Sequence, residues 1–309
     1  MWGAGSARSL ALRRSAVASG LALGAAWSTS LPATSADSAK KKKVVVTGAS
    51  GMIAQLALPA LREKYDVVAI DIRESPGVSK CDLLGSREDI RPFFKGAYAV
   101  FHAGFVPPPK DVSIATSSFL ASNIKGGSAQ KKEETQLKAA DRLFAAENSN
   151  VQMAFNVYQT AVEEGVHRVV MSSSNHAADF WEPHILDGKH DTIDPDGLAR
   201  SDNYYGWAKI AYENLGFMFA TGMMSNGVKL QNVQLRIGGP RETDVASCPK
   251  GNLRCMRRAL GAYMSQRDMQ QMVIKSIEAP DISDKDGIPF QIFYGISGNG
   301  EFTAQPLYT

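Results

Sequence analysis

The sequence is poor in cysteine, has no long apolar run and carries little net charge. Its three cysteines, Cys81, Cys248 and Cys255, are too few for a disulfide framework and favour a reducing compartment. The apolar stretch 16–27 is too short to span a bilayer, so we expect no membrane partner. A disulfide-rich scaffold and a membrane-spanning protein are therefore both disfavoured.

Charge of either sign is not concentrated in the part of the chain expected to fold. The net charge is +3 over 309 residues, and it comes partly from the N-terminus and the lysine run 40–43. Because this balance gives no basic surface for nucleic acid, no nucleic-acid partner is predicted. With 44% apolar and 21% charged residues, the chain can bury a substantial core and is expected to be globular.

The N-terminal segment has no acidic residue before Asp37, is rich in Ser and Ala, and contains Arg8, Arg13 and Arg14. This composition is typical of a transit peptide, so residues 1–42 are predicted to be a targeting peptide and linker for a mitochondrion or plastid. A secretory signal peptide is the alternative. The folded domain, a dinucleotide-binding domain with substrate-binding elements, is expected to span 43–309.

Short β-branched runs alternate with longer helical patterns from Val44 onward, which is typical of a parallel sheet with crossover helices. We therefore predict the α/β class: a Rossmann-type doubly wound parallel sheet with a small C-terminal substrate-binding region. Ligands bind such sheets outside the carboxyl ends of the strands. The expected strands are 44–46, 67–70, 99–101, 169–171, 233–236 and 291–294.

Two segments depart from this regular alternation. Pro59 lies inside the helical pattern 52–64, where it removes a hydrogen bond, so we expect a bent or shortened helix. The stretch 107–142 is rich in Lys, Ser and Gly and begins with three prolines. Insertions of this length are usually mobile or act as functional lids.

A glycine motif directly follows the first predicted strand and opens a helix. In the motif 47–51, Gly48 permits a tight turn and Gly51 lets the backbone approach a pyrophosphate. The helix N-terminus adds free N–H groups and positive potential. Ala54 stands where a third glycine is usual, which loosens the helix–strand packing only slightly. The motif therefore predicts a dinucleotide site.

Asp71 ends the second predicted strand. A carboxylate there accepts hydrogen bonds from both ribose hydroxyls and repels a 2′-phosphate, which favours NAD over NADP. Arg73 leaves NADP open, because a guanidinium at that place can bind the phosphate.

Two further segments suit the same cofactor. Asp82 and Leu83 follow a short extended segment and are expected to flank the adenine. After the next predicted strand, Ala103 and Gly104 are small enough to let the cofactor lie over the sheet edge. His102 itself is expected to be a packed core histidine rather than a ligand.

Tyr205 and Lys209 lie four positions apart, so they share one face of a predicted helix. An ammonium there lowers the pKa of the phenol and makes it a usable base near neutral pH. The serine cluster 172–174 ends an upstream strand, and one of its hydroxyls can orient a substrate oxygen. None of the other eight tyrosines has a lysine at this spacing, although a surface helix pair is the alternative interpretation.

With these motifs in order, the chain from about Val44 to Thr303 resembles the extended short-chain dehydrogenase/reductase superfamily, also called the NAD-dependent epimerase/dehydratase family. Within it, the segments 150–176, 236–238 and 258–265 resemble uronate dehydrogenases most. The resemblance implies a catalytic set of Ser174, Tyr205 and Lys209. It implies NAD contacts from Gly48, Ser50, Gly51, Met52, Ile53, Asp71, Asp82, Leu83, Ala103, Gly104, Asn150, Tyr205, Lys209 and Ile237.

The resemblance also assigns roles around the substrate. It implies that Asn150 helps to hold Lys209 through water, and that Arg258 pairs with a substrate carboxylate, for which a guanidinium fork is suited. The substrate-binding residues that it implies are Ser174, Asn175, His176 and Arg258. The sequence departs from the family pattern near Pro107, at Gly239 and in the insertion before Arg142, so the substrate stays open.

The prediction is an NAD-dependent oxidoreductase that oxidises a CH–OH group of a sugar or sugar acid to a lactone. Two alternatives stay open: a nucleotide-sugar epimerase or dehydratase with the same residues, and a non-catalytic dinucleotide-binding protein. No metal site is predicted, since His176, His184 and His190 do not place three ligands on one element. The apolar stripe of the helix 205–219 suits either core packing or a homo-oligomer.

Overall fold

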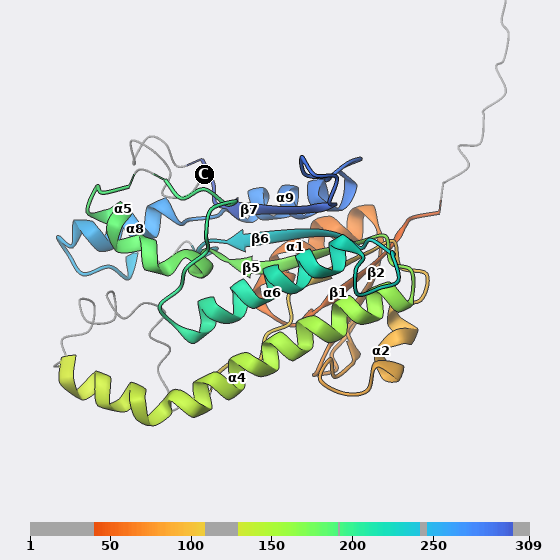
Figure 1. Ribbon diagram of the computed structural model, residues 1–309, viewed down its shortest axis with the longest axis horizontal. Helices are drawn as coiled ribbons and strands as arrows, with labels where there is room; N and C mark the ends of the chain where they lie inside the picture. The colour runs from red at the N-terminus through yellow and green to blue at the C-terminus, as the bar shows by residue number, and fades with distance from the viewer. Residues whose placement is uncertain (1–39, 109–128, 191, 242–245, 299–309) are drawn as a thin grey trace, which may run out of the picture. The chain divides into compact units, whose positions relative to one another are not determined.

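A parallel sheet of seven strands forms the centre of the protein (Figure 1). The computed structural model describes residues 40–108, 129–190, 192–241 and 246–298, and the side chains of 129–139 are not described. Lys41–Thr309 form a unit separate from Met1–Lys40. The strands are β1 (Lys43–Thr47), β2 (Asp66–Asp71), β3 (Ser79–Lys80), β4 (Ala99–His102), β5 (Arg168–Ser174), β6 (Gln231–Ile237) and β7 (Phe290–Gly295).

The strand order is β3-β2-β1-β4-β5-β6-β7, and every neighbouring pair is parallel. The chain starts in the middle of the sheet, moves outward to β3, and then crosses to β4 on the other side of β1. This is the doubly wound order, and it confirms the predicted fold class. The order reverses between β1 and β4, which is where such sheets bind ligands.

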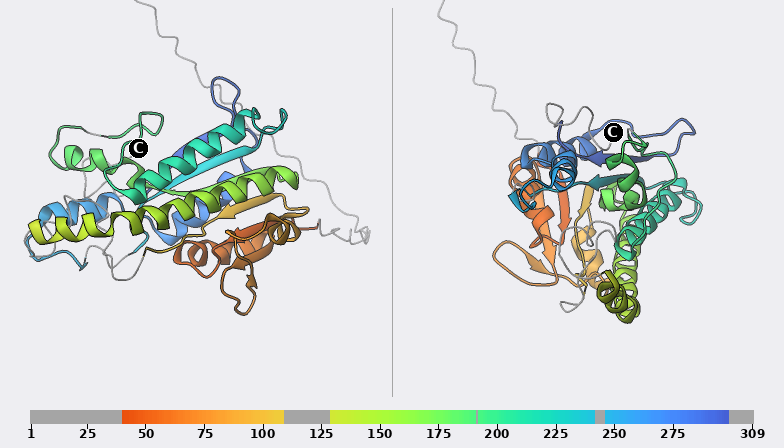
Figure 2. Two further views of the ribbon diagram at one scale, coloured as in Figure 1. Left: turned by 60° about the horizontal axis from the view of Figure 1, so that its bottom comes forward. Right: turned by 90° about the vertical axis from the view of Figure 1, so that its left-hand side faces the viewer.

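Helices cover both faces of the sheet (Figure 2). α1 (Met52–Lys64) and α9 (Gln266–Glu278) contribute to one core, and α2 (Arg87–Phe94), α4 (Ala129–Glu163) and α6 (Tyr204–Thr221) contribute to the other. Three shorter helical segments complete the described part of the chain. They are the 3-10 helix η1 (Asn175–Trp181), α5 (Glu182–Leu186) and α8 (Leu253–Gly261).

The pleat of the strands distributes their side chains between the two cores. Val44 and Val46 of β1 face α1 and α9, whereas Val45 lies in the core on the other face. All three side chains are fully buried. A strand that is covered on both faces needs apolar side chains at every position, which explains the continuous apolar runs in the sequence. All six predicted strands are confirmed, and β3 is a seventh.

The stripe predicted on α6 contributes to the core. Ala208 and Phe219 are buried there and Leu215 packs against the same cluster. Core packing therefore accounts for these three residues, and a homo-oligomer stays a prediction. In the part of the chain that the structure describes, no helix has the length and apolar character needed to cross a membrane.

Pro59 does not shorten its helix, so that alternative of the prediction is wrong: α1 runs unbroken from Met52 to Lys64. Pro59 lies on the exposed side, where water can bind the carbonyl that lacks an N–H donor. The next carbonyl along the helix, that of Leu56, accepts a hydrogen bond from Nε2 of Gln270 in α9 at 2.9 Å.

The predicted insertion is partly helix. Its portion from Ala129 to Arg142 forms the start of α4, which continues to Glu163, while 109–128 lie outside the described residues. The boundary placed at 142 therefore falls within a helix and stays a prediction. The segment is rich in Ala, Lys, Glu and Gln, which are strong helix formers, and a helix already packed on the sheet extends easily through them. A lid role for the insertion stays a prediction.

Two of the three cysteines form a disulfide, which corrects the expectation from their number. Cys248 and Cys255 are bonded, with Cα atoms 5.7 Å apart, where the chain enters α8. Asn252 caps the helix, because its Oδ1 accepts a hydrogen bond from the N–H of Cys255 at 3.0 Å. A count of cysteines does not reveal a turn that brings two of them together. Cys81 is free and buried. The pKa of its thiol is raised to about 11, chiefly because of this burial.

The disulfide predicts how many thiols react in the unfolded chain. When the protein is purified without reductant and unfolded in guanidinium, one thiol per chain is expected to react, that of Cys81. After reduction, all three cysteines are expected to react. Mass spectrometry after alkylation measures both numbers. Three alkylated cysteines without reduction would show that Cys248 and Cys255 are not bonded.

Candidate active site

The carboxyl ends of four adjacent strands bring the predicted residues to one edge of the sheet. The glycine turn follows β1, and Ala103 follows β4 and donates its N–H to the oxygen of Thr47 at 3.2 Å. Ser174 ends β5 and pairs in register with Ile237, which ends β6. Residues that are far apart in the sequence therefore lie along a single edge.

The glycine turn lies directly against the end of β4. Gly48 has a φ of +63°, and a Cβ at this position would lie 2.5 Å from the Cα of Gly104. Gly51 is the N-cap of α1 and donates its N–H to the oxygen of Gly48 at 2.8 Å. The N–H groups of the first helical turn, which includes Met52 and Ile53, have no acceptor within the helix. This cradle fits a pyrophosphate.

Asp71 joins the end of β2 to the glycine turn. Its carboxylate accepts hydrogen bonds from the N–H of Ser50 at 3.0 Å and of Arg73 at 3.1 Å. The guanidinium of Arg73 is exposed, and its Nε lies 3.8 Å from Asp71 Oδ1. A buried acid at this place suits ribose hydroxyls, so the residues present fit NAD.

Leu83 lies beside the same cradle, since a Cβ on Gly104 would be 3.5 Å from its Cδ1. Its backbone oxygen accepts a hydrogen bond from Asn156 Nδ2 at 2.7 Å. The preceding Asp82 accepts the N–H of Leu84 at 2.9 Å, which holds the turn. These contacts place both residues at the end of the short strand β3, where the adenine is expected.

His102 is a core histidine, as predicted. Its side chain is buried, and its Nδ1 lies 2.7 Å from Thr47 Oγ1. Burial chiefly, and then the nearby charge of Lys209, lower the pKa of the imidazole to about 3. The ring is therefore neutral at physiological pH.

Tyr205 lies between two aromatic rings at the start of α6. The ring of Phe105 meets it edge-on with centroids 5.6 Å apart, and the ring of His176 does so at 5.4 Å. Lys209 Nζ lies 5.3 Å from the centre of the Tyr205 ring and donates a hydrogen bond to the oxygen of Ser172 at 3.1 Å. The predicted tyrosine, lysine and serine strand end are therefore neighbours in space.

The pKa expected for the tyrosine is wrong for the protein alone. The pKa of Tyr205 is raised to about 12, chiefly by burial; a hydrogen bond with Ser174 opposes the rise, and the charges of Glu147 and Asp179 add to it. Burial also lowers the pKa of Lys209 to about 8, against the charge of Glu147. Sequence spacing gives the proximity of the two groups but not the desolvation that dominates both pKa values.

Asn150 of α4 holds the loop that follows β4. Its Oδ1 accepts the N–H of Val106 at 2.7 Å, and its Nδ2 donates to the oxygen of Val106 at 3.0 Å. The same Nδ2 donates to Glu147 Oε2 at 3.1 Å. The clamp fixes the backbone next to Phe105, which contacts Tyr205. A link from Asn150 to Lys209 through water stays a prediction.

The predicted substrate residues lie around η1 and α8. Asn175 is buried, and Ser174 Oγ accepts the N–H of His176 at 3.3 Å. Arg258 Nε donates to Glu182 Oε2 at 3.1 Å, and the Glu182 side chain is only 2% exposed. Arg258 therefore already has a carboxylate partner within the protein.

Sequence reasoning missed three acids near the predicted residues: Glu147, Asp179 and Glu182. Asp179 follows His176 by three positions, a spacing that places two side chains on one side of a helical turn. That spacing was the available signal, and the burial that gives it meaning was not visible. Glu147 and Glu182 carry no comparable signal, because their partners come from other segments.

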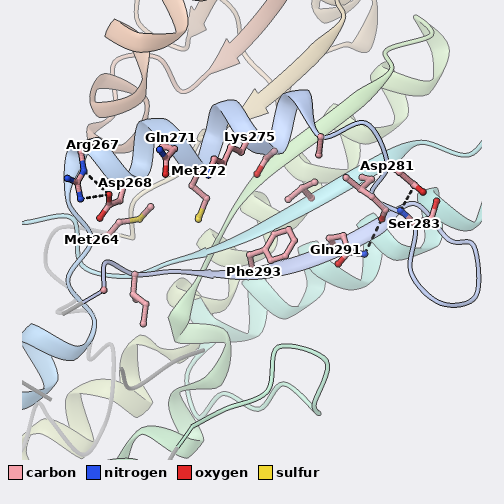
Figure 3. Close-up of a pocket in the computed structure, with 16 residues that line it drawn as sticks. Met264, Arg267, Asp268, Gln271, Met272, Lys275, Asp281, Ser283, Gln291 and Phe293 are labelled. Carbon is pink, nitrogen blue, oxygen red and sulfur yellow. Dashed lines mark hydrogen bonds and ion pairs between the residues drawn. The ribbon is translucent and has the colours of Figure 1, made fainter. Parts of the chain in front are cut away.

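The cavity drawn in Figure 3 lies elsewhere, between α9 and β7. It has a volume of about 700 Å³, and its lining includes Met264, Met272, Lys275 and Phe293. None of the predicted site residues lines it, so we do not assign it to the active site. Among the described residues, no three His, Cys, Asp or Glu side chains form a group that could hold a metal ion.

No protein-family model matches the chain. Uronate dehydrogenase of Pseudomonas syringae pv. tomato is 23% identical over 265 residues, which cover 83% of this chain and 75% of that protein. L-arabinose 1-dehydrogenase (NAD(P)(+)) of Haloferax volcanii is 26% identical over 245 residues, which cover 77% and 83%. The crystal structure of uronate dehydrogenase from Agrobacterium tumefaciens matches with a TM-score of 0.56 at 20% identity, covering 83% of this chain and 77% of that one.

These comparisons confirm the resemblance stated from the motifs. The homologues and structural neighbours are uronate dehydrogenase and related proteins with the short-chain dehydrogenase/reductase fold. Neighbours with this fold were solved with NAD bound. At these identities the structural likeness shows the fold, and the roles of individual residues rest on the geometry described above.

The close approach at Gly48 predicts a specific cost for a methyl group there. Gly48→Ala is expected to lose more stability than Gly96→Ala, because both positions have positive φ but only Gly48 meets backbone atoms. Strain alone costs about 1–2 kcal/mol. Urea unfolding measures the stability, and NADH fluorescence measures the cofactor affinity, which is expected to fall only in Gly48→Ala. Equal losses in both variants would contradict the close approach.

Proposed function

We propose that this protein is an NAD-dependent dehydrogenase that oxidises a hydroxyl-bearing carbon of a uronate to a lactone. The protein is an enzyme of the short-chain dehydrogenase/reductase kind, NAD is its cofactor, and it acts as a sugar oxidoreductase. The observation that carries the proposal is the convergence of Tyr205, Ser174 and His176 at the edge of the sheet beside the glycine turn.

The residues divide the chemistry between proton transfer and binding. NAD, when bound, supplies a hydride acceptor and a positively charged ring. Tyr205 accepts the proton of the sugar hydroxyl at its phenolate oxygen, and Ser174 Oγ holds the same hydroxyl oxygen by a hydrogen bond. Phe105 and His176 flank the tyrosine ring and restrict its orientation. The protein therefore contributes geometry and a proton acceptor.

Lys209 supplies positive charge close to the Tyr205 ring. Because burial lowers its pKa to about 8, the amine is still mostly protonated at neutral pH. The raised pKa of Tyr205 means that one ammonium does not suffice to ionise the phenol. The positive charge of a bound nicotinamide would lower the pKa of Tyr205, so proton transfer to this residue would be coupled to cofactor binding.

Removal of the Tyr205 hydroxyl tests the mechanism. Tyr205→Phe is expected to reduce the rate of NAD reduction roughly 10²-fold or more, the usual contribution of a positioned base. Tyr204→Phe is the matched control, because Tyr204 is its exposed neighbour on α6 and is expected to keep the wild-type rate. Absorbance of the reduced nicotinamide is measured with a panel of uronates and aldoses. A wild-type rate in Tyr205→Phe would refute the mechanism.

A neutral aldose is a second candidate substrate. Arg258, which would bind the carboxylate of a uronate, already forms an ion pair with Glu182. In this arrangement a substrate carboxylate has to share the guanidinium or displace Glu182, whereas a neutral sugar has no such requirement. The similarity to an L-arabinose 1-dehydrogenase supports the same candidate.

Neutralising Glu182 distinguishes the two candidates. If Arg258 binds a uronate, Glu182→Gln removes a competing charge and is expected to lower the KM for uronates about twofold to fivefold, the size of an ordinary ion pair. The KM for neutral aldoses should stay constant. Asp187→Asn is the control, since Asp187 pairs with Arg254 on the same helix. An unchanged KM for uronates in Glu182→Gln would show that Arg258 does not bind the substrate carboxylate.

A further inference from the structure

Asp179 is a fully buried carboxylate at the junction of two segments of the candidate site. It lies in η1, its side chain has no exposed surface, and it was not among the predicted residues. One neighbour is His176, and the other is Asn203, which precedes α6. A buried carboxylate is costly unless its oxygens are hydrogen-bonded, so both contacts bear on its role.

The contact with His176 defines the state of the imidazole. Both carboxylate oxygens lie 2.8 Å from His176 Nδ1. An ionised carboxylate only accepts hydrogen bonds, so the proton of this contact is on Nδ1, and in the corresponding neutral tautomer Nε2 is an acceptor. The His176 side chain keeps 17% of its surface exposed, so a ligand can reach the imidazole although it cannot reach Asp179.

The contact with Asn203 extends to the helix that carries Tyr205. Asn203 Nδ2 donates to Asp179 Oδ2 at 2.7 Å. Asn203 Oδ1 accepts the N–H of Gly206 at 2.9 Å and so caps the N-terminus of α6. One carboxylate thus holds both the histidine ring and the cap of the neighbouring helix.

The first turn of α6 lies against the backbone of His176. A Cβ on Gly206 would be 2.1 Å from the oxygen of His176 and 2.0 Å from Ser201 Oγ, so glycine permits this approach. The rings of His176 and Tyr205 then meet at a centroid distance of 5.4 Å and an angle of 69°. The relative position of the His176 and Tyr205 rings therefore depends on the hydrogen bonds that Asp179 makes with His176 and Asn203.

We propose that Asp179 is a positioning residue that fixes the His176 imidazole as the Nδ1–H tautomer and presents Nε2 to a hydroxyl group of the sugar beside Tyr205. The part that concerns the sugar rests on the proposed function, whereas the tautomer does not. The negative charge of Asp179 works against ionisation of the nearby phenol, so its contribution is the geometry of the two rings.

A side-chain exchange separates hydrogen bonding from charge. In Asp179→Asn, the amide oxygen can accept a hydrogen bond from either His176 or Asn203. The amide nitrogen, itself a donor, then faces the donor group of the other residue. In the double variant Asp179→Asn with Asn203→Asp, the amide accepts from His176 and donates to the new carboxylate, which still caps Gly206. The double variant therefore restores the hydrogen bonds with the charge moved.

Nitrogen-15 NMR of the imidazoles reads the tautomer without any turnover. The His176 signals are identified by their loss in His176→Gln. The Nδ1–H tautomer is expected in the wild-type protein and in the double variant, and a mixture of tautomers is expected in Asp179→Asn. A wild-type tautomer in Asp179→Asn would overturn the proposal. This result stands whether or not the protein oxidises a sugar, so it separates failure of this inference from failure of the proposed function.

Kinetics then test the contact with the sugar. Asp179→Asn is expected to raise the KM for the sugar about tenfold, the cost of a lost hydrogen bond to an oriented group, with a smaller change in kcat and none in the KM for NAD. The double variant is expected to recover most of the loss. Asp196→Asn, which neutralises an exposed acid, is the control. Equal losses in the single and double variants, or an unchanged KM in Asp179→Asn, would overturn the assignment.

Discussion

The buried ion pair between Glu213 and Arg236 is the interaction on which the site depends. Two hydrogen bonds of 2.8 Å join the carboxylate to the guanidinium, and the side chains are 5% and 1% exposed. Ser173 Oγ donates to the same carboxylate at 2.7 Å. Nη1 of Arg236 donates a hydrogen bond to the hydroxyl oxygen of Tyr294. The pair therefore fastens α6 to β5, β6 and β7. Loss of one partner would leave a buried charge, which costs about 3–5 kcal/mol.

This fastening explains why the site is both ordered and electrostatically unfavourable. Glu213 lies one helical turn beyond Lys209 and two beyond Tyr205, so the pair draws the proton-handling face of α6 onto the sheet. The burial that fixes Tyr205 and Lys209 raises the pKa of one and lowers that of the other, and both shifts favour the neutral forms. A positive charge near the phenol would lower the pKa of Tyr205, but it would lower the pKa of Lys209 further.

The sequence predicted what depends on local periodicity and missed what depends on contacts between distant segments. Alternating runs placed the strands, and the glycine motif placed the cradle, because each feature is encoded within a few neighbouring residues. The partner of Arg258 lies 76 positions away in α5, and no local pattern indicates it. The disulfide and the desolvation of Tyr205 likewise arise from how segments meet.

Two arginine–glutamate pairs in this protein serve different ends because their burial differs. Arg236 is closed off from solvent, meets its partner through two arms and has no room to exchange it. Arg258 meets Glu182 through Nε, keeps 24% of its side chain exposed and lies on the short helix α8. Exchange of a carboxylate partner requires solvent access to the guanidinium, which Arg258 has and Arg236 lacks, and in both pairs it leaves a buried glutamate without its partner, at a desolvation cost. Arg236 is therefore structural, whereas Arg258 keeps a guanidinium that solvent can reach.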